Sequence, residues 1–300
     1  MTERIGFIGL GLMGHGMAKN LLAKGFALTV LGHRNRAPID DLARRGAKEV
    51  KSAQALARDC DIVFLCVIGS TEVEALVRAP NGLKAGSHKN LIIVDCSTSD
   101  PSSTIALAAE LAAAGIAFCD APLGGTPAQA EEGQLSTMVG CQPIIWPRLA
   151  PVIGAWAAKA TRVGLPGDGH KLKLLMNFLS MGYGALYSEL LVVAQQAGLS
   201  PQVVDGVLRG SRFDCGMYQT FFARVLERQE AHKFTIANSH KDMRYLAAMA
   251  ERAGVANPMG NAVKNYYALA DAAGRGSDYV PALSDFVAAL NGVSLGSAPK

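Results

Sequence analysis

Ile8-Gly9-Leu10-Gly11-Leu12-Met13-Gly14 is a glycine-rich loop between an apolar run that begins at Ile5 and an amphipathic stretch that ends at Gly25. In this context the Gly-x-Gly-x-x-Gly spacing is typical of a dinucleotide-binding turn. The first glycine permits the turn, the second lets the backbone approach a pyrophosphate, and the third allows close packing of helix on strand. We therefore expect the following residues to contact a cofactor: Gly9, Leu10, Gly11, Leu12, Met13 and Gly14.

Short β-branched runs alternate with helical stretches through the first half of the chain. Strands are predicted at residues 5–10, 28–31, 62–67, 91–95 and 117–119, and helices at 13–24, 39–45, 53–58, 72–77 and 101–113. This alternation, with right-handed crossovers, builds a parallel sheet that helices cover on both faces. The predicted fold class is α/β, with a Rossmann-like doubly wound parallel sheet.

The second half of the chain has a helical pattern. After a strand-like patch at residues 136–139 and a turn-rich segment at 163–169, the alternation ceases. We predict a dinucleotide-binding domain at residues 1–166 and an all-helical substrate and dimerisation domain at residues 167–300. The pattern at 170–196 predicts one helix of roughly 40 Å, apolar nearly all round and therefore buried on most sides. Because one chain has little with which to cover it, we expect a homodimer or homotetramer.

Charge and composition exclude several classes of protein. The 29 basic and 25 acidic side chains are spread along the chain without a long basic run, so we expect no nucleic-acid partner. Lys173 and Glu189 interrupt the longest apolar region, which argues against a membrane span. The opening residues do not resemble an export signal, and the six cysteines have no Cys-x-x-Cys spacing, so a cytoplasmic location is expected. The histidines lack metal-binding spacings, so no metal site is expected.

The residues after the second predicted strand bear on which dinucleotide binds. Leu31-Gly32-His33-Arg34-Asn35-Arg36 contains no carboxylate to accept hydrogen bonds from the ribose of NAD. Arg34 and Arg36 could instead pair with a 2′-phosphate. The sequence favours NADP, with NAD as the alternative, and predicts cofactor contacts from His33 and Arg34. If both arginines are instead solvent-exposed side chains of a loop that do not contact the cofactor, the sequence gives no preference for NADP.

Ligands of an open parallel sheet lie beyond the carboxyl ends of its strands. Val67 and Ile68 follow one predicted strand and Thr98 follows the next, so we expect all three to contact the cofactor. After residue 120, Gly124, Gly125 and Thr126 offer amides and a hydroxyl that could hold a substrate carboxylate. The alternative is an ordinary connecting loop.

Lys173 and Asn177 are four residues apart on the long predicted helix and therefore share a face. A lysine there could donate a proton to a carbonyl oxygen that receives a hydride, and accept it in the reverse direction. Lys171 is the rival position. Either lysine could also be a side chain that extends to solvent without catalytic work.

The order of these motifs resembles the β-hydroxyacid dehydrogenase family, which includes 3-hydroxyisobutyrate dehydrogenase and tartronate semialdehyde reductase. The resemblance runs nearly end to end and rests on four blocks. These are Ile5 to Gly14 with Met17-Ala18-Lys19-Asn20-Leu21; Asp120 to Ala130 with Gly133 and Met138-Val139-Gly140; Gly167-Asp168-Gly169 with Lys173 and Asn177; and Lys241-Asp242. The family's second domain is all-helical, as in 6-phosphogluconate dehydrogenase.

The resemblance implies roles for these residues. It selects Lys173 over Lys171 as the proton-transfer residue, with Asn177 beside it as the second catalytic group. It places Lys241 and Asp242 near the nicotinamide, Lys241 also near the substrate. The family usually has Ser-Gly-Gly where this chain has Gly124-Gly125-Thr126, so a serine contact to the substrate acid is missing here.

The expected activity is hydride transfer between NADP(H) and a small 3-hydroxy acid or semialdehyde. An imine reductase of the same architecture is one alternative, although a charged lysine suits protonation of an alkoxide better. The other is a protein that binds NADP as a sensor and has no turnover.

Overall fold

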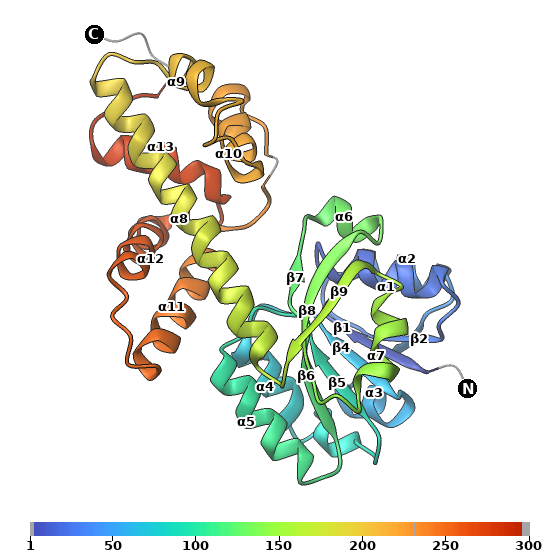
Figure 1. Cartoon of the computed structure of the whole chain (residues 1–300). Coiled ribbons are helices and arrows are strands. Elements are labelled where there is room, and N and C mark those ends of the chain that lie inside the picture. The colour runs from blue at the N-terminus through green and yellow to red at the C-terminus, as the bar shows by residue number, and fades with distance from the viewer. Residues whose placement is uncertain (1–2, 231, 296–300) are drawn as a thin grey trace. The chain divides into compact units, whose positions relative to one another are not determined.

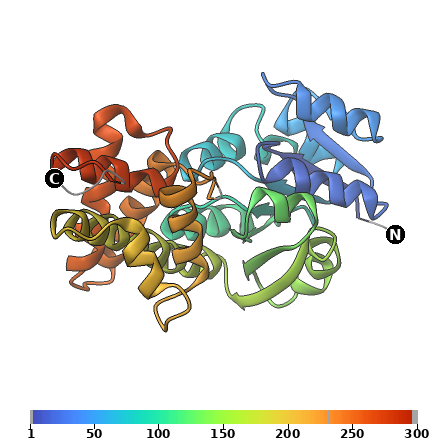
Figure 2. The same cartoon turned by 90° about the horizontal axis from the view of Figure 1, so that it is seen from above.

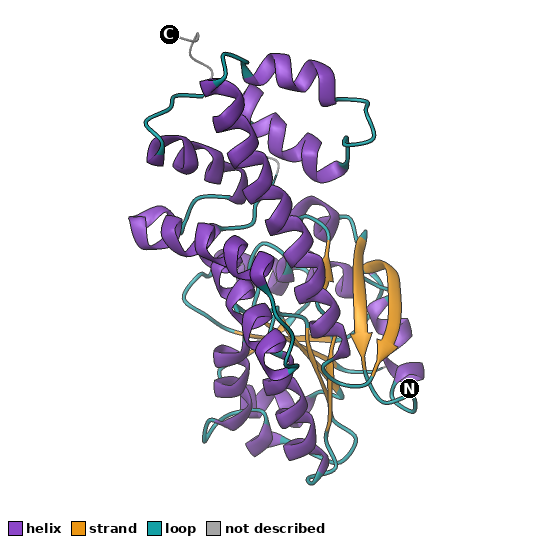
Figure 3. Ribbon diagram, turned by 60° about the vertical axis from the view of Figure 1, so that its left-hand side comes forward, coloured by secondary structure: helices purple, strands orange, loops and turns teal. Residues whose placement is uncertain are grey.

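The structure is a computed structural model that describes residues 3–230 and 232–295. The chain forms two compact units that divide after Lys173 (Figure 1). Strands, orange in Figure 3, belong to the first unit, whereas the second is built from helices. The predicted division after residue 166 lies just before helix α8 (Asp168–Gln196), which runs from the first unit into the second.

The sheet of the first unit has the order β3-β2-β1-β4-β5-β6-β8-β7, with β9 beside β8. Its strands are β1 (Ile5–Ile8), β2 (Leu28–Leu31), β3 (Lys48–Val50), β4 (Ile62–Leu65), β5 (Ile92–Asp95), β6 (Ala117–Asp120), β7 (Leu123–Gly124), β8 (Leu135–Gly140) and β9 (Ala157–Gly164). The pairs from β3 to β6 are parallel, whereas β8 is antiparallel to β6 and β7. The order reverses between β1 and β4, so the predicted doubly wound fold is confirmed.

Helices cover both faces of this sheet. They are α1 (Gly14–Ala23), α2 (Ala37–Arg44), α3 (Ala53–Asp59), α4 (Ser70–Arg78), α5 (Pro101–Ala112), α6 (Pro127–Glu131) and α7 (Trp146–Ile153), with a 3₁₀ turn at Lys84–Gly86. Side chains alternate along the strands: Ile62 and Phe64 join the core under α1, α2, α6 and α7, whereas Val63 and Leu65 join the core under α3, α4 and α5. Burial on both faces explains why these strands are continuous apolar runs.

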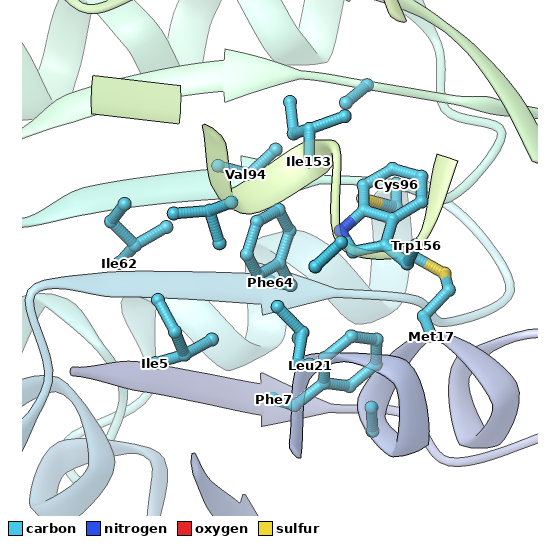
Figure 4. Packing of buried hydrophobic residues seen from close by; sticks show 14 of the residues in the cluster. Ile5, Phe7, Met17, Leu21, Ile62, Phe64, Val94, Cys96, Ile153 and Trp156 are labelled. Carbon is cyan, nitrogen blue, oxygen red and sulfur yellow. The ribbon is translucent and has the colours of Figure 1, made fainter. Parts of the chain in front are cut away.

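An aromatic cluster closes the first of these cores (Figure 4). The Phe64 ring lies 6.0 Å from the Trp156 ring, edge to face, and 6.1 Å from the Phe7 ring. Trp156 is fully buried and leads directly into β9. This core therefore ties the last strand of the unit to its first.

Three strands, β3, β7 and β9, were not predicted from the sequence. The first two have three residues and two residues, too few for a periodic pattern. Among the strands that the structure describes, β9 pairs with β8 alone, and it leaves polar residues such as Lys159 exposed. Two predicted strands end earlier in the structure: β1 ends at Ile8 and β4 at Leu65, so Leu10 and Val67 lie in the loops that follow.

The second unit is shown by the yellow to red helices of Figure 2. It contains most of α8 and α9 (Pro201–Leu208), α10 (Gly216–Glu227), α11 (Ile236–Arg252), α12 (Pro258–Ala270) and α13 (Leu283–Leu290), with short turns at Asp271–Arg275 and Val280–Ala282. The long helix predicted at 170–196 is confirmed. Within the described ranges, no helix has the length and apolar character that crossing a membrane requires.

One expectation about α8 is wrong for the single chain. Its side chains at Leu174, Met181 and Leu191 are buried, but Leu179 is 60% and Val193 68% exposed. The surrounding helices cover only one side of α8. An apolar stripe therefore remains on the surface, formed by Leu175, Leu179, Leu186 and Val193.

Candidate active site

The glycine-rich loop between β1 and α1 has the shape that a pyrophosphate requires. Gly9 has a φ of +95°, and a Cβ there would lie 2.1 Å from the Cys66 carbonyl oxygen. A Cβ at Gly14 would lie 1.9 Å from the Gly9 oxygen, whereas one at Gly11 would meet no atom within 4 Å. The first and third glycines are thus required by packing, and the second borders open space in front of α1. The loop fits a dinucleotide whose pyrophosphate faces a helix N-terminus.

The loop after β2 separates the two candidate arginines. Arg36 donates hydrogen bonds to both carboxylate oxygens of Glu49, at 2.6 and 2.9 Å, and to Asp40 at 3.0 Å. These bonds raise the pKa of its guanidinium further above its already high ordinary value. His33 and Arg34 are exposed. Glu49 was not predicted as a partner of Arg36, because its strand β3 has only three residues.

The loops after β4 and β5 are joined by a hydrogen bond. The Val67 N–H donates to the Ser97 hydroxyl oxygen over 3.0 Å. Ile68 is exposed, and Thr98 is half-buried between the buried Ser97 and Ser99. Val67 and Thr98, which the sequence assigned to the cofactor from different strands, therefore belong to one bonded pair of loops.

The Asp120 carboxylate at the end of β6 is fully buried and holds the start of α8. It accepts the N–H of Gly167 at 2.6 Å and that of His170 at 2.7 Å. Burial raises the pKa of Asp120, and the His170 ring and these two amides oppose that shift. A Cβ at Gly169 would lie 2.7 Å from the Asp120 carboxylate and 2.4 Å from the Met138 oxygen. Gly169 is therefore required by close packing around a buried carboxylate, whereas Gly167 has a φ of +98°, a conformation that favours glycine.

Thr126, predicted to bind substrate, begins α6 with a capping box. Its hydroxyl accepts the Gln129 N–H at 3.3 Å, and its own N–H donates to the Gln129 side chain at 2.9 Å. Gly125 has a φ of +127°, a conformation that favours glycine. The capping box and the Gly125 conformation thus define the shape of the loop 124–126.

A buried polar cluster, which the sequence analysis missed, lies where β5 and β6 end. His170 is fully buried, with its ring nitrogens 3.8 Å from the carboxylates of Asp95 and Asp120. The available signals were a histidine directly after the Gly-x-Gly pair and an aspartate at the end of each of two strands. Among the side chains that the structure describes, no group of three or more His, Cys, Asp and Glu could hold a metal ion. We therefore treat the cluster as a network of hydrogen bonds and charges.

The two lysines in the first turns of α8 differ in their surroundings. Lys171 is 45% exposed and pairs with Asp168 at 2.8 Å, three residues earlier on the helix. Lys173 is half-buried. Because they are two residues apart, they point to different sides of the helix. Lys171 therefore belongs to an ion pair with Asp168, whereas Lys173 lies on another side of α8.

In the second unit, three predicted site residues are bonded together. Asn177 is buried and donates to the Asp242 carboxylate at 2.6 Å. Lys241 lies 3.1 Å from the other Asp242 oxygen, and its ammonium is 5.3 Å from the Tyr245 ring. Asp242 is fully buried. Its carboxylate fixes the Asn177 amide on α8 and the Lys241 ammonium on α11.

Comparison with known proteins agrees with this architecture. Residues 4–164 match the family described as the NAD binding domain of 6-phosphogluconate dehydrogenase. Residues 167–285 match the family described as NAD-binding of NADP-dependent 3-hydroxyisobutyrate dehydrogenase.

Individual relatives agree as well. The 3-sulfolactaldehyde reductase of Escherichia coli (strain K12) is 31% identical over 273 residues, which are 91% of each chain. The 2-hydroxy-3-oxopropionate reductase of the same organism is 32% identical over 243 residues, 80% of this chain and 82% of that protein. The crystal structure of 3-hydroxyisobutyrate dehydrogenase from Salmonella typhimurium superposes with a TM-score of 0.84 at 23% identity, over 95% of this chain and 99% of that one. The chain therefore belongs to the β-hydroxyacid dehydrogenase family of NAD(P)-dependent oxidoreductases.

Proposed function

We propose that the protein transfers a hydride between NADP(H) and a small 3-hydroxy acid or its semialdehyde, with Lys173 as the proton-transfer residue. One observation carries the proposal. The hydrogen bonds from Gly167 and His170 to Asp120 fix the start of α8 at the carboxyl end of β6, the edge at which open α/β sheets bind ligands. Lys173 is therefore held near that edge, whereas Lys171 is paired with Asp168.

The proposed cofactor is NADP, with NAD as the alternative. The loop from Gly9 to Gly14 would hold the pyrophosphate, and Val67, Ile68 and Thr98 would border the nicotinamide half. Arg34, beside His33, would pair with the 2′-phosphate, because Arg36 is bonded to Glu49 and Asp40. When bound, the reduced cofactor supplies the hydride.

In the proposed reaction Lys173 donates a proton to the substrate oxygen as the carbonyl carbon is reduced, and takes the proton back in the oxidation. General acid–base assistance of this kind contributes roughly 10²- to 10⁴-fold to the rate. Gly124, Gly125 and Thr126 are assigned to the substrate's acid group. Asn177 and Lys241 are assigned to the reaction from the order of the motifs, and within the second unit Asp242 holds both side chains. The two reductases above are named for short aldehydes that bear an acid group, which supports this substrate class.

Two lysine variants test the assignment. Lys173→Ala should lower kcat at least about a hundredfold and leave NADPH affinity little changed, because only the proton transfer is lost. Lys171→Ala removes a half-exposed lysine two residues away and should keep kcat within about twofold, because a surface ion pair contributes little. Stopped-flow rates and fluorescence titrations with NADPH measure both quantities. Equal kcat in the Lys173→Ala variant and the parent would remove Lys173 from the mechanism.

A further inference from the structure

The His170 side chain connects three segments of the first unit. Its Nε2 lies 3.1 Å from the Ser97 carbonyl oxygen, in the loop after β5. Its Nδ1 lies 2.8 Å from the Thr104 hydroxyl, in α5. Because a carbonyl oxygen only accepts, Nε2 carries the hydrogen of its bond. The ring thus joins α8 to the loop after β5 and to α5.

Ser97 carries this connection further, to the loop after β4. Its hydroxyl oxygen accepts the Val67 N–H at 3.0 Å, and its own N–H donates to Asp95 at 2.8 Å. The second oxygen of Asp95 accepts the Ser99 hydroxyl at 2.7 Å. The bonded path from His170 therefore reaches Val67 and passes beside Thr98, two residues that we assign to the cofactor.

Lys173 lies on α8 three residues after His170, so the two side chains lie on neighbouring turns of one helix. The His170 backbone is bonded to Asp120 and its ring to Ser97, which fixes the first turn of α8 in both position and rotation. A shift of that turn would move the Lys173 ammonium relative to the loops after β4 and β5. Misplacement by about 1 Å can cost on the order of a hundredfold in rate.

We propose that His170 is a positioning residue of the reaction, which sets the place of Lys173 relative to the cofactor loops at Val67 and Thr98. The inference rests on the proposed role of Lys173. Fully buried polar groups with several partners serve this purpose well, because each partner restricts the ring and the loss of any one leaves a buried group unpaired.

A double-mutant cycle tests the proposal. The variants are His170→Leu, Lys173→Ala and the pair together, assayed in single turnover with NADPH and the best substrate among succinic, malonic, methylmalonic and tartronic semialdehydes. Leu149→Ala is the matched control, since it removes a fully buried side chain of α7 and destabilises the same unit away from α8. Thermal unfolding and NADPH affinity are measured for every variant.

His170→Leu should lower the single-turnover rate between about tenfold and a hundredfold when Lys173 is present, and by less than about twofold in the Lys173→Ala background. NADPH affinity should stay within about threefold in all variants. His170→Gln, whose amide can still donate toward Ser97, should recover most of the lost rate. Leu149→Ala should lower the unfolding temperature and leave the rate of the folded enzyme unchanged.

Three results would overturn the inference in distinguishable ways. The first is that His170→Leu lowers the single-turnover rate by the same factor in the parent and in Lys173→Ala. The second is that the His170→Leu variant has the rate of the parent. Either result would show that His170 serves stability alone, and the role of Lys173 would stand. A parental rate in Lys173→Ala would remove the proposed function and this inference together. If the leucine variant does not fold, His170→Asn replaces it with the same expected outcome, because it is polar and too short to reach Ser97.

Discussion

At the scale of single residues, the folded structure distinguishes two arginines that the sequence leaves equivalent. Both follow β2, but Arg36 is bonded to Glu49 and Asp40, whereas Arg34 is exposed. Arg34→Ala should therefore weaken NADPH binding roughly tenfold to a hundredfold relative to NADH, because a hydrogen bond between charged groups contributes about 1.5 to 3 kcal/mol. Fluorescence titration with both cofactors measures the ratio. Arg44→Ala, a change at an exposed arginine of α2, is the control, and an unchanged ratio for Arg34→Ala would contradict the assignment.

Asp41 gives a prediction about pH. Hydrogen bonds from Arg45 and from His15, the latter at 3.0 Å, lower the pKa of its carboxyl from an ordinary 3.8 to about 2. Because the pKa of Asp41 is lower in the folded than in the unfolded chain, its ionised carboxylate stabilises the folded protein at pH values above about 4. This contribution is lost as the pH falls from about 4 to about 2. Urea unfolding should therefore show a smaller loss of stability across that window for Asp41→Asn than for the parent. If the unfolding free energies of the two proteins fall by the same amount across that pH range, the prediction is contradicted.

At the scale of elements, the capping box at α6 gives a stability prediction. Thr126→Ala removes the hydroxyl that accepts the Gln129 N–H, which should cost about 1 kcal/mol of unfolding free energy. Thr126→Ser keeps the hydroxyl and should lose much less. Chemical denaturation measures both. A cost as large for serine as for alanine would show that the methyl group, and not the cap, stabilises this loop.

Elements were predictable where the pattern is local. Helices α1 to α5 and strands β1, β2, β4, β5 and β6 have apolar periodicity bounded by glycine turns or capping residues. β3 and β7 are too short for a pattern, and β9 is a half-exposed edge. Among the candidate site residues, Lys173 and Asn177 were predicted from helical spacing and motif order, and their roles stay a prediction. The positions of His170 and Asp120 carried a sequence signal, but the contacts of His170, Asp120 and Glu49 could not be predicted, because their partners are distant in sequence and meet them only in the folded chain.

At the scale of the whole molecule, the apolar stripe of α8 bears on assembly. Leu175, Leu179, Leu186 and Val193 are all more than two-fifths exposed and lie on one side of the helix. We propose that a second copy of the chain covers them, in a homodimer or homotetramer. Light scattering at micromolar concentration should give at least a dimer. The double variant Leu179→Glu with Leu186→Glu should give a monomer, because a carboxylate in an apolar contact is costly.

The control for this experiment is Ile144→Glu. Ile144 is 80% exposed and lies in the loop between β8 and α7, outside the apolar stripe, so the change should leave the oligomer intact. A parent protein that is monomeric at these concentrations would contradict the assembly proposal. It would not affect the proposed reaction, which rests on residues within the chain.

The central claim is that the protein reduces short aldehydes bearing an acid group at the expense of NADPH. The most direct measurement is NADPH consumption by the purified protein with succinic, malonic, methylmalonic and tartronic semialdehydes, glyoxylate and sulfolactaldehyde, each repeated with NADH. We predict turnover of at least one of them, faster with NADPH than with NADH and lost in Lys173→Ala. NADPH binding without turnover of any member would contradict the claim, and would favour an imine substrate or a sensing role.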